Sequence, residues 1–599
     1  MQKQQNGVIS PKQAGTLCGL FVERVRRSPD KVAYRYFQQN AWRDMTWRQM
    51  RGEVARWQAG LARLGLQRGD RVAIMLRNCP YWLMFDQAAL SLGLVVVPLY
   101  TVDRPDNIAY IVNDAGVKVL LFENAEQWQA LRTVRDQLGG VVRFISIENV
   151  GNVNEPRLKS MAEFLPPAAQ LQYSLACKTN ELATIIYTSG TTGKPKGVML
   201  SHANILTNAH ACLDTFTVRS DDVFLSFLPL SHTFERTLGY YLPIMAGATV
   251  AFARSIPLLS KDMQAIRPTL LISVPRIYER IYSAIRTKLD EGLPLKRKLF
   301  HLAVETGWAR FEYAQGRASW KASFLLWPLL QKLVAQKILD RLGGRLRVAI
   351  SGGAALSPEI SRVFVGLGLP VVQGYGLTET SPVVTGNRLD NNFPDSVGQP
   401  ILDVQVRIGE QSVLLVKGPN VMLGYWNNPE ATRDMIDDDG WLNTGDVARI
   451  SETGHVYITG RVKEIIVMSN GEKVPPTDME MAILHDPLFD QVMIFGEAHP
   501  YLVALAVLNP EGWQNFAREI GIRPDMPEAL TDSRVEAKFL RRIARNLRGF
   551  PGYAKVNRVL LLREPWSIEN GLLTPTLKIK RNLVMEQFAA QIKQLYEGH

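Results

Sequence analysis

From about residue 31 to residue 252, short runs of apolar residues alternate with longer stretches in which apolar residues recur every three or four positions. The runs predict buried strands at 71–76, 94–97, 117–122, 141–145, 183–187, 223–227 and 249–252. The helical spacing predicts helices at 49–64, 106–113, 125–137 and 203–216, the last one capped by Ser201. Strands that alternate with helices are typical of parallel, doubly wound α/β sheets, and we expect that fold class.

The pattern changes after residue 345. A buried strand at 346–350 is followed by two short apolar runs at 404–408 and 412–416, which predict antiparallel strands of a small β subdomain. A helix beginning near Pro476 and strands at 491–495 and 502–508 predict a compact α+β region at the C-terminal end. A large α/β part is therefore expected to precede a small α+β part.

Residues 281–345 have the least regular pattern of the chain. After Pro328 we expect one amphipathic helix, whose apolar and basic residues are Leu330, Lys332, Leu333, Val334, Lys337, Ile338 and Arg341. Two interpretations stay open: the helix covers a sheet, or it forms an interfacial surface that contacts anionic lipid.

Composition narrows the class of protein. A chain of 599 residues exceeds one hydrophobic core, and its net charge of +12 favours anionic partners such as a nucleotide, a phosphorylated cofactor or a lipid surface. Nucleic acid is not expected, because no zinc-finger or RNP-like string accompanies the charge. The four cysteines are scattered, which fits a reducing compartment. The polar first residues and the interrupted apolar run at 88–100 predict a cytoplasmic protein, or one peripheral on the cytoplasmic membrane face.

One loop stands out chemically, Tyr-Thr-Ser-Gly-Thr-Thr-Gly-Lys-Pro-Lys-Gly at 187–197. Its glycines allow backbone N–H groups to converge on an anion, and its hydroxyl groups and lysines add donors and charge. Pro195 excludes the common P-loop spacing. The loop suits a polyphosphate.

Seven further strings follow in order: Pro-Leu-Ser-His-Thr-Phe-Glu-Arg at 229–236, Leu-Ile-Ser-Val-Pro-Arg-Ile-Tyr-Glu-Arg at 271–280, Ser-Gly-Gly-Ala-Ala at 351–355, Gln-Gly-Tyr-Gly-Leu-Thr-Glu-Thr-Ser at 373–381, Gly-Trp-Leu-Asn-Thr-Gly-Asp at 440–446, His-Val-Tyr-Ile-Thr-Gly-Arg-Val-Lys-Glu at 455–464 and Leu-Leu-Thr-Pro-Thr-Leu-Lys-Ile-Lys-Arg at 572–581. Together with the loop, these strings resemble the motifs of the adenylate-forming superfamily, from about residue 20 to about residue 587. The strings at 229–236 and 271–280 are similar to those of long-chain fatty acyl-CoA synthetases.

The resemblance implies roles for individual residues. Tyr375 would stack on adenine, Thr378 would touch the α-phosphate, Asp446 would hold both ribose hydroxyls, and Glu379 would hold Mg²⁺ with help from Thr191. The remaining nucleotide-binding residues implied are Thr188, Ser189, Gly190, Thr192, Gly193, Gly352, Gly353, Ala354, Gln373, Gly374, Gly376, Arg461 and Lys578.

Catalysis is assigned by the same resemblance to Lys578, Glu379, Thr191 and Lys194, and the acyl group to His232, Phe234 and Arg276. Many relatives have Ser-Gly-Lys where this chain has Thr-Leu-Lys, so Lys580 is a rival for Lys578.

Gly460 matches the hinge of relatives that carry Asp or Lys there. The resemblance thus divides the chain into residues 1–459, with an insert at 281–345 and a β subdomain at about 398–459, and a mobile domain at 460–599.

We therefore expect a ligase that uses ATP, Mg²⁺ and coenzyme A to convert long-chain fatty acids into acyl-AMP and then acyl-CoA. Alternatives are a fatty acyl-AMP ligase that delivers to a carrier protein, a peptide-synthetase adenylation domain and a non-catalytic lipid-binding relative. A homodimer and a peripheral contact with anionic membrane are further expectations.

Overall fold

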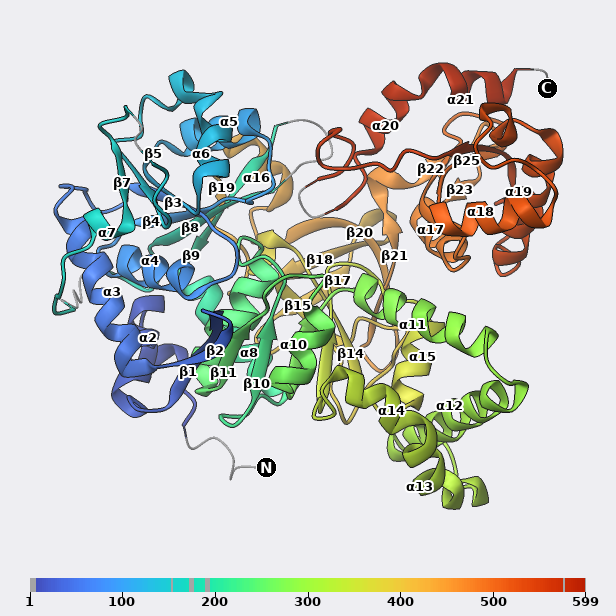
Figure 1. The fold of residues 1–599 in the computed structure, drawn as a ribbon, viewed down its shortest axis with the longest axis horizontal. Helices are drawn as coiled ribbons and strands as arrows, with labels where there is room; N and C mark the ends of the chain where they lie inside the picture. The colour runs from blue at the N-terminus through green and yellow to red at the C-terminus, as the bar shows by residue number, and fades with distance from the viewer. Residues whose placement is uncertain (1–6, 152–153, 172–176, 189–193, 575–576, 598–599) are drawn as a thin grey trace.

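The computed structural model describes residues 7–151, 154–171, 177–188, 194–574 and 577–597. Its two largest sheets lie in the part of the chain before the C-terminal α+β region (Figure 1). The first has the order β16–β15–β14–β13–β12–β10–β11–β1–β2, with β1 (Val32–Gln38), β2 (Ala41–Thr46), β10 (Val223–Ser226), β11 (Thr249–Phe252), β12 (Leu270–Ser273), β13 (Val348–Ser351), β14 (Val371–Gly376), β15 (Val383–Gly386) and β16 (Gln399–Pro400). The second has the order β19–β9–β8–β4–β3–β5–β6–β7, with β3 (Arg71–Met75), β4 (Val95–Pro98), β5 (Val117–Phe122), β6 (Arg143–Ser146), β7 (Leu158–Ser160), β8 (Leu182–Thr188), β9 (Lys196–Ser201) and β19 (Gly424–Tyr425).

Both sheets are parallel in the middle and antiparallel at the edges. In the first, β14 to β1 are parallel, while β15, β16 and β2 pair antiparallel. In the second, β8 to β7 are parallel, while β9 and β19 run antiparallel. The predicted doubly wound α/β class is confirmed, with antiparallel edges that the sequence pattern did not predict.

The strands are apolar throughout because each central strand is buried on both faces. Along β3, Val72 and Ile74 face the core between the two sheets, whereas Ala73 and Met75 face the opposite side. The core between the sheets contains α2 (Leu17–Arg27), α3 (Trp47–Ala62), α4 (Pro80–Ser91), α8 (His202–Phe216) and α9 (Leu242–Ala246). On the outer faces lie α5 (Pro105–Ala115), α6 (Ala125–Arg132), α10 (Leu259–Ile266), α11 (Pro275–Asp290) and α15 (Pro358–Gly366).

Residues 281–345 are mostly helical, although their sequence pattern is the least regular of the chain. The segment contains the end of α11, then α12 (Pro294–Ala314), η3 (Ala322–Leu326), α13 (Trp327–Leu330), η4 (Gln331–Ala335), α14 (Gln336–Leu339) and η5 (Asp340–Leu342). Apolar residues are spread around α12 rather than along one stripe, which hides its helical period. At Gly307 the helix crosses α15 so closely that a Cβ atom would lie 1.7 Å from the Gly366 carbonyl oxygen.

The expected β subdomain is a four-stranded antiparallel sheet, β17 (Gln405–Ile408), β18 (Val413–Lys417), β20 (Leu442–Ile450) and β21 (Val456–Arg461). The C-terminal α+β region contains the pair β22 (Ile466–Val467) and β23 (Lys473–Val474) and the sheet β24 (Phe489–Phe495), β25 (Leu502–Leu508) and β26 (Val556–Leu562). One face of the three-stranded sheet carries α17 (Pro476–Leu484), α18 (Pro510–Glu519) and α19 (Ser533–Asn546), and the other α20 (Arg581–Gln587) and α21 (Ala589–Tyr596).

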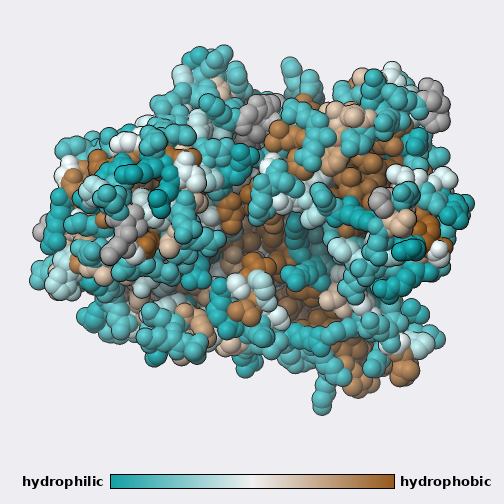
Figure 2. Space-filling model, turned by 45° about the horizontal axis from the view of Figure 1, so that its top comes forward, coloured by the Kyte–Doolittle hydropathy of each residue, from teal (hydrophilic) through white to brown (hydrophobic). Residues whose placement is uncertain are grey.

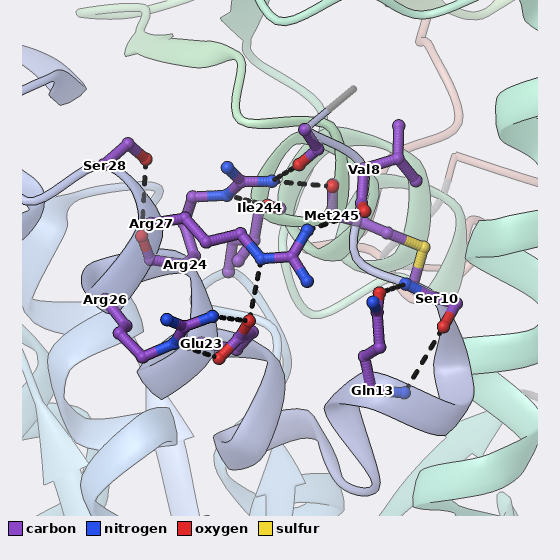
Figure 3. A network of polar contacts seen from close by, with 11 residues as sticks. Val8, Ser10, Gln13, Glu23, Arg24, Arg26, Arg27, Ser28, Ile244 and Met245 are labelled. Atoms are coloured by element: carbon purple, nitrogen blue, oxygen red, sulfur yellow. Dashed lines mark hydrogen bonds and ion pairs between the residues drawn. The ribbon is translucent and has the colours of Figure 1, made fainter. Parts of the chain in front are cut away.

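Arg24 is one of the residues that attach the N-terminal segment to the centre of the molecule. Arg24 of α2 donates from Nε to the Ile244 carbonyl oxygen, 2.7 Å away, and from Nη2 to that of Met245, 2.8 Å away (Figure 3). Both carbonyls belong to the last turn of α9, where a cation also meets the negative end of the helix dipole.

Among the described helices, none has the length and apolarity needed to cross a bilayer.

Candidate active site

Most of the predicted nucleotide-binding residues lie where strands of the first sheet end. Gly352, Gly353 and Ala354 follow β13, and Gly374, Tyr375 and Gly376 close β14. Because the two strands are parallel neighbours, their carboxyl ends meet at one edge, the usual place for a ligand in an open α/β sheet. The next turn, η6 (Thr378–Thr380), brings Thr378 and Glu379 beside them.

Tyr375, Asp446 and Arg461 form one hydrogen-bonded group. The Tyr375 hydroxyl donates to Asp446 Oδ2 at 2.5 Å, and Arg461 Nε donates to Oδ1 at 2.7 Å. Asp446 and Arg461 face each other across β20 and β21, so the hairpin register sets this ion pair. Burial, followed by the charge of Asp446, raises the pKa of Tyr375 well above its ordinary value. The carboxylate is buried, and only 8% of its side chain is exposed.

Glu379 lies beside an aromatic residue that is absent from the predicted set. The Tyr425 hydroxyl donates to Glu379 Oε1 at 2.8 Å, and the Met422 N–H donates to the Glu379 carbonyl oxygen at 2.9 Å. The Lys196 ammonium lies 5.1 Å from the centroid of the Tyr425 ring. Tyr425 belongs to the two-residue strand β19, which gives no periodic pattern in the sequence. The second carboxylate oxygen of Glu379 accepts no hydrogen bond among the described residues.

The loop at 187–197 is the connection of the β8–β9 hairpin, in which Thr188 pairs with Lys196. Its residues Ser189, Gly190, Thr191, Thr192 and Gly193 lie outside the described residues. The Lys194 ammonium lies 5.1 Å from the centroid of the Tyr110 ring of α5. The side chain borders a polar cavity of about 270 Å³ that Tyr110, Lys196 and Asn427 also line.

Lys578 reaches this site from the C-terminal region. Charge interactions link it to Arg461, Asp446, Glu464 and Glu379, and its own charge acts on His232. Part of the side chain remains exposed, but the surrounding protein excludes enough water to lower the pKa of the ammonium group, and the nearby Arg461 lowers it further.

The rival residue Lys580 interacts instead with Asp103, at the loop before α5. Close by, a Cβ atom on Gly571 would lie 3.4 Å from Arg104 Nη1, so this loop contacts the C-terminal region. The two lysines therefore face different partners.

The residues predicted for the acyl group are only partly brought together. Phe234 packs so tightly on Gly352 that a Cβ atom there would lie 2.9 Å from the ring. His232 accepts a hydrogen bond from the Phe234 N–H at 3.1 Å, and burial together with Lys578 lowers the pKa of its imidazole to about 4. Arg276 is exposed on the first turn of α11, where its charge acts on Glu279.

Gln373 is held by main-chain groups. Its amide nitrogen donates to the Pro394 carbonyl oxygen, and its amide oxygen accepts from the Leu356 N–H at 2.8 Å. Both ends of the side chain thus join loops around the site.

Gly460 lies inside β21, opposite Val447, with φ of +158°. The site therefore combines a neutral imidazole, a carboxylate with a free oxygen, a buried carboxylate and several cations. Such a set can bind a nucleotide and stabilise charge on its phosphates, and the described residues of the site include no serine or cysteine nucleophile with a base.

Comparison with known proteins identifies the family. Residues 21–426 match the family described as AMP-binding enzyme, and residues 463–599 match the AMP-binding enzyme C-terminal domain. The long-chain-fatty-acid–CoA ligase FadD15 of Mycobacterium bovis is 30% identical over 591 residues, which cover 97% of each chain. The peroxisomal long chain acyl-CoA synthetase 6 of Arabidopsis thaliana is 34% identical over 90% of this chain and 79% of its own.

Among solved structures, the A domain of carboxylic acid reductase from Segniliparus rugosus, in complex with AMP and a co-purified carboxylic acid, superimposes with a TM-score of 0.76. The match covers 100% of this chain and 98% of that one at 21% identity, which shows the fold. The chain belongs to the AMP-binding, adenylate-forming enzyme family.

Proposed function

We propose that this protein is an ATP-dependent long-chain fatty acid–CoA ligase. In the first step a carboxylate oxygen of the acid attacks the α-phosphorus of ATP, the bond to the β-phosphate breaks, and pyrophosphate leaves. In the second step the CoA sulfur attacks the acyl carbon, the thiol gives up its proton, and AMP leaves. Family membership and the curated relatives named as long-chain-fatty-acid–CoA ligases support this reaction.

The nucleotide is assigned to the carboxyl ends of β13 and β14, beside Asp446 of β20. We assign adenine to the face of Tyr375 and the two ribose hydroxyls to Asp446, whose carboxylate is already oriented by Tyr375 and Arg461. The missing side chain at Gly352 leaves room for the Phe234 ring. These contacts position ATP before any bond is broken.

The chemistry of Glu379 fits Mg²⁺, a hard cation that prefers oxygen ligands. Its carboxylate has one oxygen fixed by Tyr425 and one free, and no group of three acidic, histidine or cysteine side chains gathers anywhere in the described residues. A cation held by Glu379 and Thr191 would thus take most of its ligands from the phosphates and water, and would neutralise charge there. Thr378 is assigned to the α-phosphate, and Lys194 to the charge on the departing pyrophosphate.

The observation that carries the proposal is the position of Lys578. A lysine of the C-terminal region lies within electrostatic reach of both Asp446 and Glu379, residues assigned to opposite ends of the bound nucleotide. An ammonium group between them is placed to stabilise negative charge that builds at the α-phosphate. This arrangement suits the first step.

For the second step we propose that residues 460–599 move as a domain about Gly460, so that Lys578 withdraws and the CoA thiol gains access to the acyl carbon. The charge of Lys578 acts on His232, and Phe234 packs on Gly352, which supports their assignment to the acyl end. We also propose a peripheral contact with anionic membrane, since long-chain acids partition into bilayers and the chain is basic.

The test is CoA-ester formation with saturated acids from acetate to stearate, with AMP release measured in the presence and absence of CoA. We expect the highest kcat/KM with the longest acids and AMP release that depends on CoA. AMP release that is equal with and without CoA would favour delivery to another acceptor. If no acid supports ATP–pyrophosphate exchange, the protein is not a ligase of this kind.

A further inference from the structure

The helical insert exposes a group of large apolar side chains that its own packing does not use. Trp320, Leu325, Leu326, Leu329 and Leu333 are 54%, 75%, 49%, 58% and 43% exposed. The four leucines lie on η3, α13 and η4, and Trp320 comes just before η3. These elements are at the lower right of Figure 1, where Figure 2 shows hydrophobic surface along the rim of the molecule. We call these five residues the apolar face of the insert.

This face is a second apolar side of helices that already have a buried side. Trp327, Leu330 and Ala335 of the same helical run are buried in one cluster with Phe300 and Val304 of α12. A helical segment that is apolar on two sides, but packs against the protein with only one of them, can bind a further partner with the other. The fold of the monomer therefore does not explain the apolar face.

The charge around the face is strongly positive. Residues 293–345 contain ten Lys or Arg and three Asp or Glu, so this segment holds +7 of the net charge of +12. Lys332, Lys337 and Arg341 follow or interrupt the leucines on the same helical run and are exposed. None of the ion pairs between described residues includes one of these three. The cations are therefore available to an anionic partner.

From the juxtaposition of the apolar face with these unpaired cations, we propose that the insert docks the enzyme onto an anionic lipid bilayer. The leucines and Trp320 would enter the interface while the basic side chains contact the headgroups, as for an amphipathic helix that lies in the membrane plane. A second copy of the chain is a poorer occupant, because a symmetric contact through this face would bring like charges together. The inference rests on the peripheral contact proposed above and names its surface.

The test is flotation with vesicles, without ATP or acid, so that its result is independent of the ligase assay. Vesicles of phosphatidylglycerol and phosphatidylcholine in equal parts are compared with vesicles of phosphatidylcholine alone. The parent protein is expected to float with the anionic vesicles and to be released by salt. Equal partition onto both vesicles, or no partition, overturns the proposal.

Two sets of substitutions locate the surface. Leu325→Ser/Leu326→Ser/Leu329→Ser is expected to weaken partition at least tenfold, because the interfacial apolar area is lost. The matched control removes three exposed apolar side chains elsewhere and should bind like the parent: Val142→Ser/Ile256→Ser/Leu402→Ser. Partition that is equal in the two variants overturns the assignment.

The basic residues are tested in the same way. Each Lys or Arg side chain removed near an anionic leaflet weakens membrane binding by about fivefold. Lys332→Gln/Lys337→Gln/Arg341→Gln should therefore lose most anionic binding, whereas the control with the same change of charge should lose little: Lys178→Gln/Lys538→Gln/Lys555→Gln. Light scattering completes the test, since a dimer that dissociates in the leucine variant would assign the face to self-association and overturn docking.

Discussion

Asp446→Ala should abolish the discrimination between ATP and its 2′-deoxy analogue. An ionised carboxylate offers about four lone-pair positions, two on each oxygen. In the structure Tyr375 uses one on Oδ2 and Arg461 uses one on Oδ1, which leaves one position on each oxygen. Two acceptor positions therefore remain for the two ribose hydroxyls. Tyr375 and Arg461 orient the carboxylate without using all of its acceptor positions.

The magnitude follows from the kind of bond. A hydrogen bond to a charged group contributes roughly 1.5–3 kcal/mol, so the loss of two would weaken ATP binding by about 3–6 kcal/mol, or roughly 10²–10⁴ in Kd. The 2′-deoxy nucleotide lacks one of the two hydroxyls. The parent should thus prefer ATP by about 10–10²-fold, and Asp446→Ala should show a ratio near one.

Calorimetric titration of both nucleotides in the absence of fatty acid measures this ratio without turnover. Tyr375→Phe is the matched control, because it removes the hydroxyl that donates to Asp446 and keeps the ring. We expect that variant to keep its preference for ATP. If Asp446→Ala folds normally and still discriminates as the parent does, the carboxylate does not hold the ribose.

Three further predictions use other parts of the structure. Lys578→Ala should slow ATP–pyrophosphate exchange by ~10²–10³ and Lys580→Ala far less, and the opposite order would move the role to Lys580. Gly460→Pro should depress exchange more than the conversion of preformed acyl-adenylate, because proline fixes φ near −65° and the observed φ is +158°; normal exchange would contradict this. Burial raises the pKa of Glu235 to about 8, so the carboxyl group keeps its proton to a higher pH in the folded state than in the unfolded state. The contribution of this group to the free energy of unfolding is therefore lost as pH rises from about 4.5 to 8. Glu235→Gln should therefore raise the thermal midpoint relative to the parent more at pH 8 than at pH 5.5, and an equal change at both would place the titration elsewhere.

The sheets could be predicted from the sequence because their central strands are buried on both faces. The expected strands at 117–122, 183–187 and 249–252 agree with β5, β8 and β11 within a residue. The cap was also predictable, since the Ser201 hydroxyl accepts the Asn204 N–H at 3.1 Å and begins α8. Local chemistry decides both features.

Strand pairing and the insert could not be predicted, because they depend on contacts distant in sequence. Nothing in the runs at 183–187 and 196–201 indicates that β8 and β9 form a hairpin at a sheet edge. The helix α12 depends on its close crossing with α15 at Gly307, and its apolar residues face several partners.

The site shows the same division. The motif strings indicate which residues matter, but the contact between Tyr375 and Asp446 joins positions 71 residues apart. The role of Tyr425 beside Glu379 depends on the antiparallel pairing of β19 with β9, in which Tyr425 faces Val198. A two-residue strand has no period that a sequence pattern can reveal, so this residue was missed.

The charges around Lys578 suggest why a lysine carried by the C-terminal region suits only one of the two steps. Arg461 and Lys578 lie close enough for the arginine to lower the pKa of the lysine, so the closed arrangement brings two cations together. With ATP present, the phosphates offset that repulsion. Once pyrophosphate has left, fewer negative charges remain between the cations, and we infer that the closed arrangement loses stability at the point where CoA must enter. In the proposed movement about Gly460, a residue beyond the hinge leaves that path, whereas a residue fixed in the sheet would remain in it.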